Sequence, residues 1–72
     1  MTDKVLTGIK NTRRDTFTEF LDSKHTANDL AHLCLTFFLY LMNLREQDLI
    51  TLEEVKEQSD SFQDMLTKLL KA

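Results

Sequence analysis

Apolar residues in the last third of the chain recur at alternating steps of three and four, the spacing of one helix face. This stripe consists of Leu52, Val55, Ser59, Phe62, Leu66 and Leu69. It follows a capping box in which Thr51 is the N-cap and Glu54 lies at the third helical position. Ile50 and Val55 occupy the two positions of a hydrophobic staple around this start. The pattern predicts a helix over about residues 52–70.

The middle of the chain, residues 30–44, is apolar around most of a helical circumference. A second capping box, between Thr26 and Asp29, precedes it and predicts a helix over about residues 27–46. Its strongly polar members share one narrow face with Asp29; they are His32, Thr36 and Asn43. A helix that is apolar nearly all round is buried on several sides or lies in a membrane.

The length of this apolar run favours burial within the protein over a membrane span. Fifteen helical residues rise only about 22 Å, whereas a hydrocarbon core is about 30 Å thick and needs about 20 residues. His32 and Asn43 also lie within the run. We therefore expect no membrane-spanning helix.

The first segment carries a weaker helical pattern. A partial capping box begins at Thr12, and Phe17, Phe20 and Leu21 follow at helical spacing. Apolar residues upstream extend the same face, so the amphipathic helix starts either near residue 3 or near Thr12. The single glycine, Gly8, weakens the longer alternative by about 1 kcal/mol.

Turn-forming residues are scarce throughout the sequence. The chain has no proline, one glycine and no Asn-Gly or Asp-Gly pair. A β-rich fold needs several such turns. The sequence therefore predicts an all-α fold of three helices in a single domain, residues 1–72. An antiparallel helical hairpin, 27–46 and 52–70, follows the N-terminal helix.

The small size of the chain indicates a second copy. A single core rarely stabilises 72 residues by more than a few kcal/mol, and one cysteine cannot form an internal disulfide. Two neighbouring helices also leave part of the apolar middle helix uncovered, and symmetric dimers commonly cover such a patch. We predict a helical-bundle homodimer. The residues predicted for self-association are Phe37, Phe38, Tyr40, Leu41 and Met42.

The charge distribution suggests where another molecule would bind. The net charge is −3, but residues 1–24 carry five basic and four acidic side chains, whereas residues 25–72 carry four basic and eight acidic ones. We expect partner-facing residues on both parts of the chain; they are Arg13, Arg14, Glu53, Glu57 and Asp60. Nucleic-acid-binding proteins generally have a stronger basic footprint than this.

The sequence contains little that supports catalysis or metal binding. Cys34 has no base on its own helix face, because His32 is two residues away and points elsewhere. His25, Asp29 and His32 have a spacing found in metal sites but provide only three ligands. There is no glycine-rich phosphate loop. We expect no enzyme activity, no cofactor and no bound metal.

These observations predict a non-enzymatic helical interaction protein that acts as a homodimer and modulates a partner protein. By analogy at the level of fold, this is typical of phage- or plasmid-type accessory systems. A small nucleic-acid-binding transcriptional regulator that uses the basic N-terminal helix is the alternative. A subunit that folds fully only with a different protein is a third. The single cysteine and the absence of an apolar leader predict a cytoplasmic location.

Overall fold

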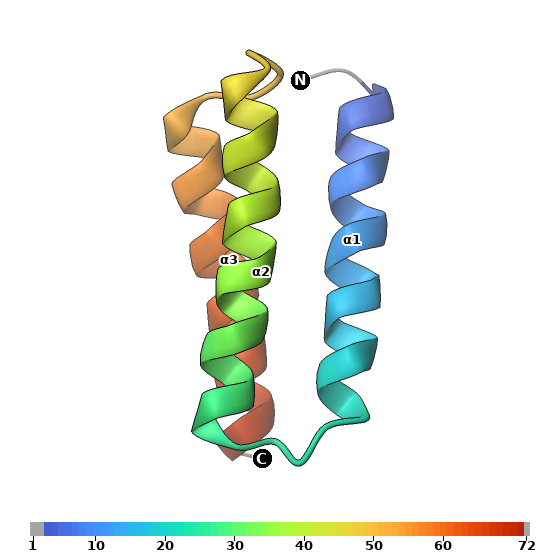
Figure 1. Ribbon diagram of the computed structural model, residues 1–72, viewed down its shortest axis with the longest axis vertical. Helices are drawn as coiled ribbons and strands as arrows, with labels where there is room; N and C mark the ends of the chain where they lie inside the picture. The colour runs from blue at the N-terminus through green and yellow to red at the C-terminus, as the bar shows by residue number, and fades with distance from the viewer. Residues whose placement is uncertain (1–2, 72) are drawn as a thin grey trace.

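The computed structural model describes residues 3–71, and its regular elements are three α-helices (Figure 1). They are α1 (Asp3–Leu21), α2 (Ala27–Glu46) and α3 (Leu52–Lys71). No strand occurs within this described part of the chain. The all-α prediction and the predicted helical hairpin are confirmed, and α1 begins at the earlier of its two predicted starts.

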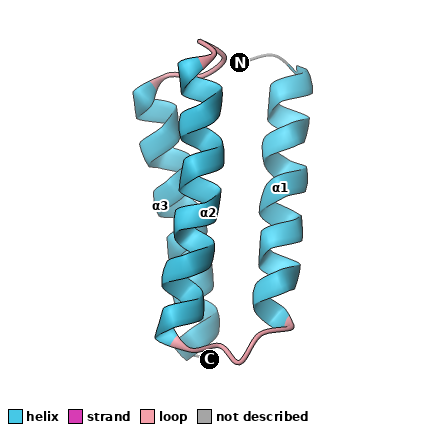
Figure 2. Ribbon diagram, viewed as in Figure 1, coloured by secondary structure: helices cyan, strands magenta, loops and turns pink. Residues whose placement is uncertain are grey.

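The three helices run down, up and down along an elongated bundle of 35 × 18 × 16 Å (Figure 1). Two loops at opposite ends of the bundle connect them (Figure 2). α2 packs most extensively against α3, less against α1, and α1 and α3 touch only weakly. The middle helix is therefore the one on which both others pack.

Capping boxes begin both helices of the hairpin, as predicted. The Asp29 amide donates to Thr26 Oγ1 at 3.2 Å, and the Thr26 amide donates to Asp29 Oδ2 at 3.3 Å. At α3, the Glu54 amide donates to Thr51 Oγ1 at 3.1 Å, and the Thr51 amide donates to Glu54 Oε1 at 2.9 Å. These reciprocal bonds satisfy backbone donors that have no partner within the helix.

α2 ends in a Schellman motif formed without glycine. Asp48 has a φ of 59°, in the left-handed region. Its amide donates to the Arg45 carbonyl at 2.9 Å, and the Leu49 amide donates to the Leu44 carbonyl at 3.0 Å. Both bonds are those of the motif. Because Asp tolerates this conformation better than most residues do, the turn forms in a chain that has almost no glycine.

One hydrophobic core runs between the helices. Its buried apolar members are Ile9, Phe20, Leu33, Phe37, Leu41, Leu44, Ile50, Val55, Phe62 and Leu66. At its centre the rings of Phe37 and Phe62 lie 4.6 Å apart and are tilted by 49°, a geometry that aromatic pairs prefer. The buried hydroxyl of Thr16 donates to the Thr12 carbonyl at 2.8 Å, so its burial leaves no unpaired polar atom.

One member of the predicted α3 stripe, Leu52, is exposed, and two others, Ser59 and Leu69, are half-buried. Val55, Phe62 and Leu66 are buried, whereas the side chain of Leu52 is 43% exposed. Leu52 lies in the first turn of α3 and lines a hollow beside Arg45 at the α2–α3 turn. The apolar stripe therefore begins at Leu52, one stripe member before Val55, where the packing of α3 in the core begins.

Candidate interaction surface

The side of α2 that faces away from the core carries two strongly exposed leucines. Leu35 is 55% exposed and Leu39 is 57% exposed, the highest values among the large hydrophobic residues that the structure describes. They lie four residues apart and therefore stack on one face of the helix. An exposed apolar pair of this kind loses its contact with water when another surface covers it, which favours association.

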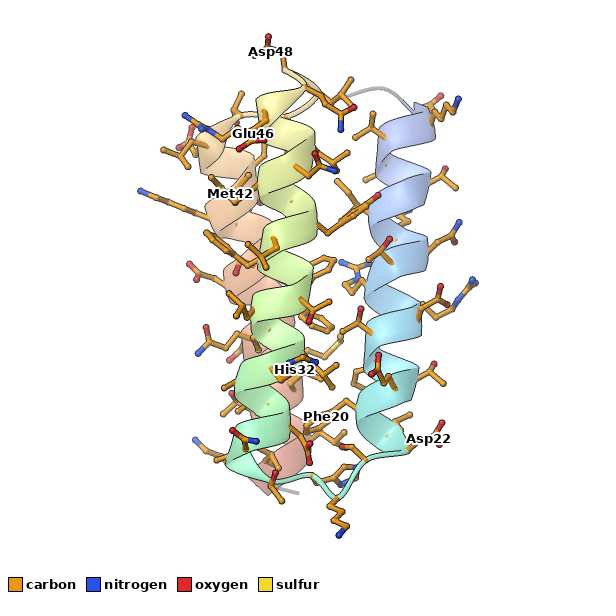
Figure 3. All side chains as sticks on the ribbon, viewed as in Figure 1. Phe20, Asp22, His32, Met42, Glu46 and Asp48 are labelled. Carbon is orange, nitrogen blue, oxygen red and sulfur yellow. The ribbon has the colours of Figure 1, made fainter. Side chains whose placement is uncertain are left out.

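These leucines belong to a longer row of residues on the same side of α2, which we call the outer stripe. Its members are Asn28, His32, Leu35, Leu39, Met42 and Glu46. Met42 is half-buried and the other five are exposed. His32, Met42 and Glu46 are spread along α2, which lies in front of α3 in this view (Figure 3).

The structure places the five predicted self-association residues in three different environments. Phe37 and Leu41 have no exposed surface and belong to the core of the single chain, so they are not available to a second copy. Tyr40 is half-buried and lies on the side of α2 that faces Gly8 of α1. Phe38 and Met42 are half-buried and border the outer stripe or belong to it. Self-association through these five residues stays a prediction, and in the single chain only Phe38, Tyr40 and Met42 reach the surface.

Sequence reasoning missed Leu35 and Leu39 as surface residues. The sequence contained a signal that separates two opposite faces of this helix. One face is apolar throughout and consists of positions 30, 33, 37, 41 and 44. The other face has polar residues at its two ends and consists of positions 28, 32, 35, 39, 42 and 46. The face with polar ends is the one that a folded chain turns toward water. In α2 this difference is small, because both faces have apolar centres.

The three predicted partner-facing acids lie together on one side of α3. Glu53, Glu57 and Asp60 follow helical steps of four and three, and all are exposed. Asp64 continues the row, but its carboxylate pairs with Lys68 at 3.1 Å. The first three residues of this acidic face present their carboxylates to solvent, a surface that suits a basic partner.

The two predicted basic residues of α1 do not form a shared patch. Arg14 is exposed and its Nε lies 3.7 Å from the carboxylate of Asp15. Arg13 is half-buried and, as the adjacent helical residue, points about 100° away from Arg14. A local ion pair and this divergence weaken the basic footprint that a nucleic-acid surface requires.

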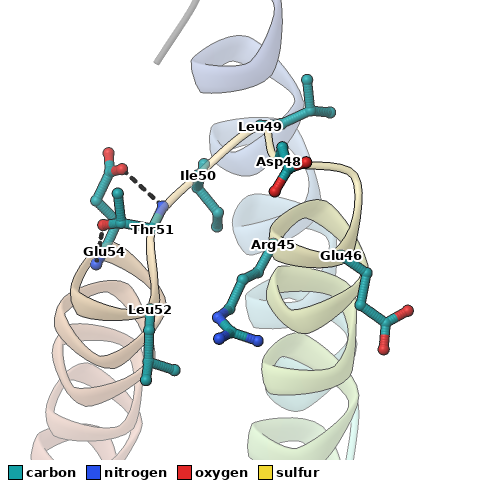
Figure 4. Close-up of a pocket in the computed structure, with 8 residues that line it drawn as sticks. All are labelled: Arg45, Glu46, Asp48, Leu49, Ile50, Thr51, Leu52 and Glu54. Atoms are coloured by element: carbon teal, nitrogen blue, oxygen red, sulfur yellow. Dashed lines mark hydrogen bonds between the residues drawn. The ribbon is translucent and has the colours of Figure 1, made fainter.

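A hollow of about 640 Å³ lies at the turn between α2 and α3 (Figure 4). Arg45 projects from the end of α2 toward the first turn of α3, beside Leu52 (Figure 4). The Glu54 carboxylate on the same hollow already accepts the Thr51 amide at 2.9 Å. Since Arg45, Glu46 and Asp48 are all exposed, the hollow presents mixed charges to solvent and, among the residues that line it, no buried polar group aimed at a ligand.

The residues considered for chemistry are occupied by local contacts. Cys34 is half-buried, and this burial raises the pKa of its thiol above the ordinary value of 9.0, which lowers the fraction of reactive thiolate. The His25 ring stacks on Phe20 at 4.9 Å, and its Nε2 lies 3.2 Å from the Leu21 carbonyl oxygen. Within residues 3–71, no three His, Cys, Asp or Glu side chains are grouped closely enough to hold a metal ion.

Two further findings bear on the class of protein. Among the residues described, no helix combines the length and the apolar character that crossing a membrane requires. Comparison with protein-family models, curated proteins and solved structures finds no match to this chain. Residues 3–71 form a small three-helix protein whose outer stripe carries exposed leucines on α2 and whose α3 carries an acidic face.

Proposed function

We propose that this protein is a non-enzymatic interaction protein that forms a homodimer through α2 and, as a dimer, binds and modulates a partner protein. The observation that carries the proposal is the exposed pair Leu35 and Leu39 on the outer side of the middle helix. An accessory role of the phage or plasmid type, in the cytoplasm, fits a small chain with a single half-buried thiol.

The first experiment tests self-association. We expect a dimer by sedimentation or light scattering at tens of micromolar. Replacing both leucines, Leu35→Gln with Leu39→Gln, should give a monomer that keeps its helical circular dichroism, because glutamine is a good helix former. Leu21→Gln is the matched control, because Leu21 is 46% exposed but lies on α1. A wild-type monomer under these conditions would overturn the proposal.

The second experiment tests the partner-binding face. The acidic face of α3 supports binding to a basic protein surface, because Glu53, Glu57 and Asp60 are exposed and no cation within residues 3–71 forms a salt bridge with them. Changing all three to Gln should abolish capture of a basic protein that the wild type retains. A variant with Asp22→Asn, an exposed acid outside this face, should retain it. Equal capture by both variants would count against the acidic face.

Nucleic-acid binding through α1 is the weaker proposal, because Arg13 and Arg14 diverge and one of them pairs locally. It predicts a salt-dependent mobility shift of duplex DNA that Arg13→Gln with Arg14→Gln removes. No shift at low salt would exclude this alternative.

A further inference from the structure

The outer stripe of α2 has a spacing that the core does not require. Its six residues follow steps of four, three, four, three and four, from Asn28 to Glu46. This is the a/d spacing with which one helix packs along another. The core side of α2 has its own apolar face, and α1 and α3 already cover it. The outer stripe is therefore a face of the same helix that neither α1 nor α3 covers, and its apolar centre consists of Leu35, Leu39 and Met42.

The stripe is symmetric about residue 37. Leu35 and Leu39 lie at equal distances on either side of this point, as do His32 and Met42. Asn28 and Glu46 form the outermost pair. If the helix is reversed end to end about residue 37, the six stripe positions therefore occupy the same places along the helix axis. This symmetry permits a twofold axis that passes beside α2 at the level of residue 37.

The charges of the stripe distinguish the two ways in which a second copy can pack. In a parallel pair each residue meets its own counterpart, so the two Glu46 carboxylates lie opposite each other and repel. In an antiparallel pair Glu46 lies opposite Asn28, in the first turn of the second helix. There the positive end of the helix dipole favours a carboxylate, and the Asn28 amide group can donate to it.

Neighbouring side chains are consistent with the antiparallel arrangement. Arg45, the cation nearest to Glu46 in the sequence, projects toward the first turn of α3, whereas Glu46 points to the other side of α2 (Figure 4). Phe38 is half-buried beside the stripe and lies one residue from its symmetry point. In an antiparallel pair the two Phe38 rings would therefore approach each other next to the twofold axis.

We propose that two copies of this chain pack antiparallel along α2, with Leu35 of each copy against Leu39 of the other. The inference rests on the proposed function and deepens it, because it commits the outer stripe to a second copy of this chain and fixes the orientation and register. Helices packed in this way lie about 8–10 Å apart, close enough for cysteines facing each other to be joined by a short bis-maleimide.

Cross-linking tests the orientation. In a Cys34→Ser background, one preparation carries Asn28→Cys and a second, distinguishable by mass, carries Glu46→Cys. After mixing, we expect cross-linked dimers that contain one chain of each kind. Two chains that both carry Asn28→Cys should not cross-link to each other, because antiparallel packing separates the two substituted positions by 18 helical residues, about 27 Å. Lys10→Cys, exposed on α1, provides the background from random collisions.

The outcomes separate the orientation from the dimer itself. Cross-links of residue 28 to residue 28 and of residue 46 to residue 46 would overturn the antiparallel register while leaving the homodimer intact. Cross-linking at Lys10→Cys above the level of the stripe positions would overturn the use of α2. A monomer with no cross-link would overturn the proposed self-association as well.

A charge substitution tests the same register without any cysteine. Glu46→Gln removes a favourable contact from each end of an antiparallel dimer, so we expect its dissociation constant to rise about three- to tenfold. In a parallel dimer the same change removes a repulsion, and the dissociation constant should fall. Glu19→Gln, an exposed acid of α1, is the matched control and should leave it unchanged. A lower dissociation constant for Glu46→Gln would overturn the antiparallel register.

Discussion

Gly8 of α1 lies directly against the phenol of Tyr40 of α2. A methyl group placed on Gly8 would lie 2.9 Å from the Tyr40 hydroxyl oxygen, closer than carbon and oxygen approach without a shift. The two residues line a pocket of about 370 Å³ between the start of α1 and the end of α2. The only glycine of the chain therefore lies where a side chain of α2 approaches the backbone of α1.

Gly8→Ala should stabilise the protein more when this contact is relieved than when it is present. Alanine in a helix interior is favoured over glycine by about 0.5–1 kcal/mol, but its methyl group would displace the Tyr40 hydroxyl. We expect nearly the full gain in a Tyr40→Phe background and a smaller gain in the wild type. Urea unfolding of the four proteins at one concentration gives the coupling. Equal gains in both backgrounds would show that the two residues do not interact.

Asp48→Gly should stabilise the end of α2. Asp48 has a φ of 59°, a conformation that costs a residue with a Cβ about 1 kcal/mol and costs glycine little. The two hydrogen bonds of the motif use backbone atoms only, so they remain in the variant. We expect a gain of about 0.5–1 kcal/mol in the free energy of unfolding. Asp22→Gly, which follows α1 at a position without positive φ, should give no gain. A similar gain at both positions would point to a general effect of losing an acidic residue.

The capping box of α3 should make stability depend on acid pH. The hydrogen bond from the Thr51 amide lowers the pKa of Glu54 below the ordinary value of 4.5. Because the pKa is lower in the folded state, the stabilisation is present above pH 4.5 and is lost as the pH falls through the folded-state pKa. Glu54→Gln should therefore reduce stability more at about pH 6.5 than at about pH 3. Glu53→Gln, the adjacent acid of the same turn, is the control.

Thr51→Ala tests the other half of the same box. Removing the hydroxyl leaves the Glu54 amide without its acceptor at the helix start. Such N-cap replacements cost about 1 kcal/mol of stability. Thermal and urea unfolding should show this loss, and Thr67→Ala, near the other end of α3, should not reproduce it. A negligible loss in Thr51→Ala would mean that the cap is replaced by solvent.

Helix ends were predictable from the sequence because they depend on local chemistry. Thr26 and Thr51 each exchange hydrogen bonds with the acidic residue three positions later in the chain. These bonds determine where each helix begins, independently of the rest of the fold. The periodic residues Phe62 and Leu66 likewise identify the buried side of α3, since its other side is charged. In α3, where the apolar and charged faces are distinct, sequence and structure agree except at Leu52 in the first turn, which is exposed.

The orientation of α2 was not predictable in the same way. Its apolar residues surround nearly the whole helix, so only the polar residues at the two ends of one face distinguish the side of Leu35 and Leu39 from the side of Phe37 and Leu41. The positions of α1 and α3 decide which side is buried, and these depend on packing between distant parts of the chain. Phe37 was predicted for self-association because two neighbouring helices leave part of this circumference uncovered, whereas the structure pairs it with Phe62 in the core.

Cys34 should react slowly in the folded protein. Burial raises the pKa of its thiol, so less thiolate is present at a given pH than in the unfolded chain. We expect alkylation at about pH 8 to be at least about tenfold slower in the native protein than in urea, with the native rate still rising toward about pH 10. Because the pKa of the Cys34 thiol is higher in the folded chain than in the unfolded chain, the unfolded chain loses this proton first as the pH rises. The free energy of unfolding should therefore decrease as the pH rises above 9.0. Cys34→Ser should weaken this alkaline loss of stability. Lys10→Cys in the Cys34→Ser background provides an exposed thiol and should react at nearly the unfolded rate. Equally fast alkylation of native Cys34 would show that its half-buried thiol is freely accessible in the folded chain, and the predicted protection by burial would then be wrong.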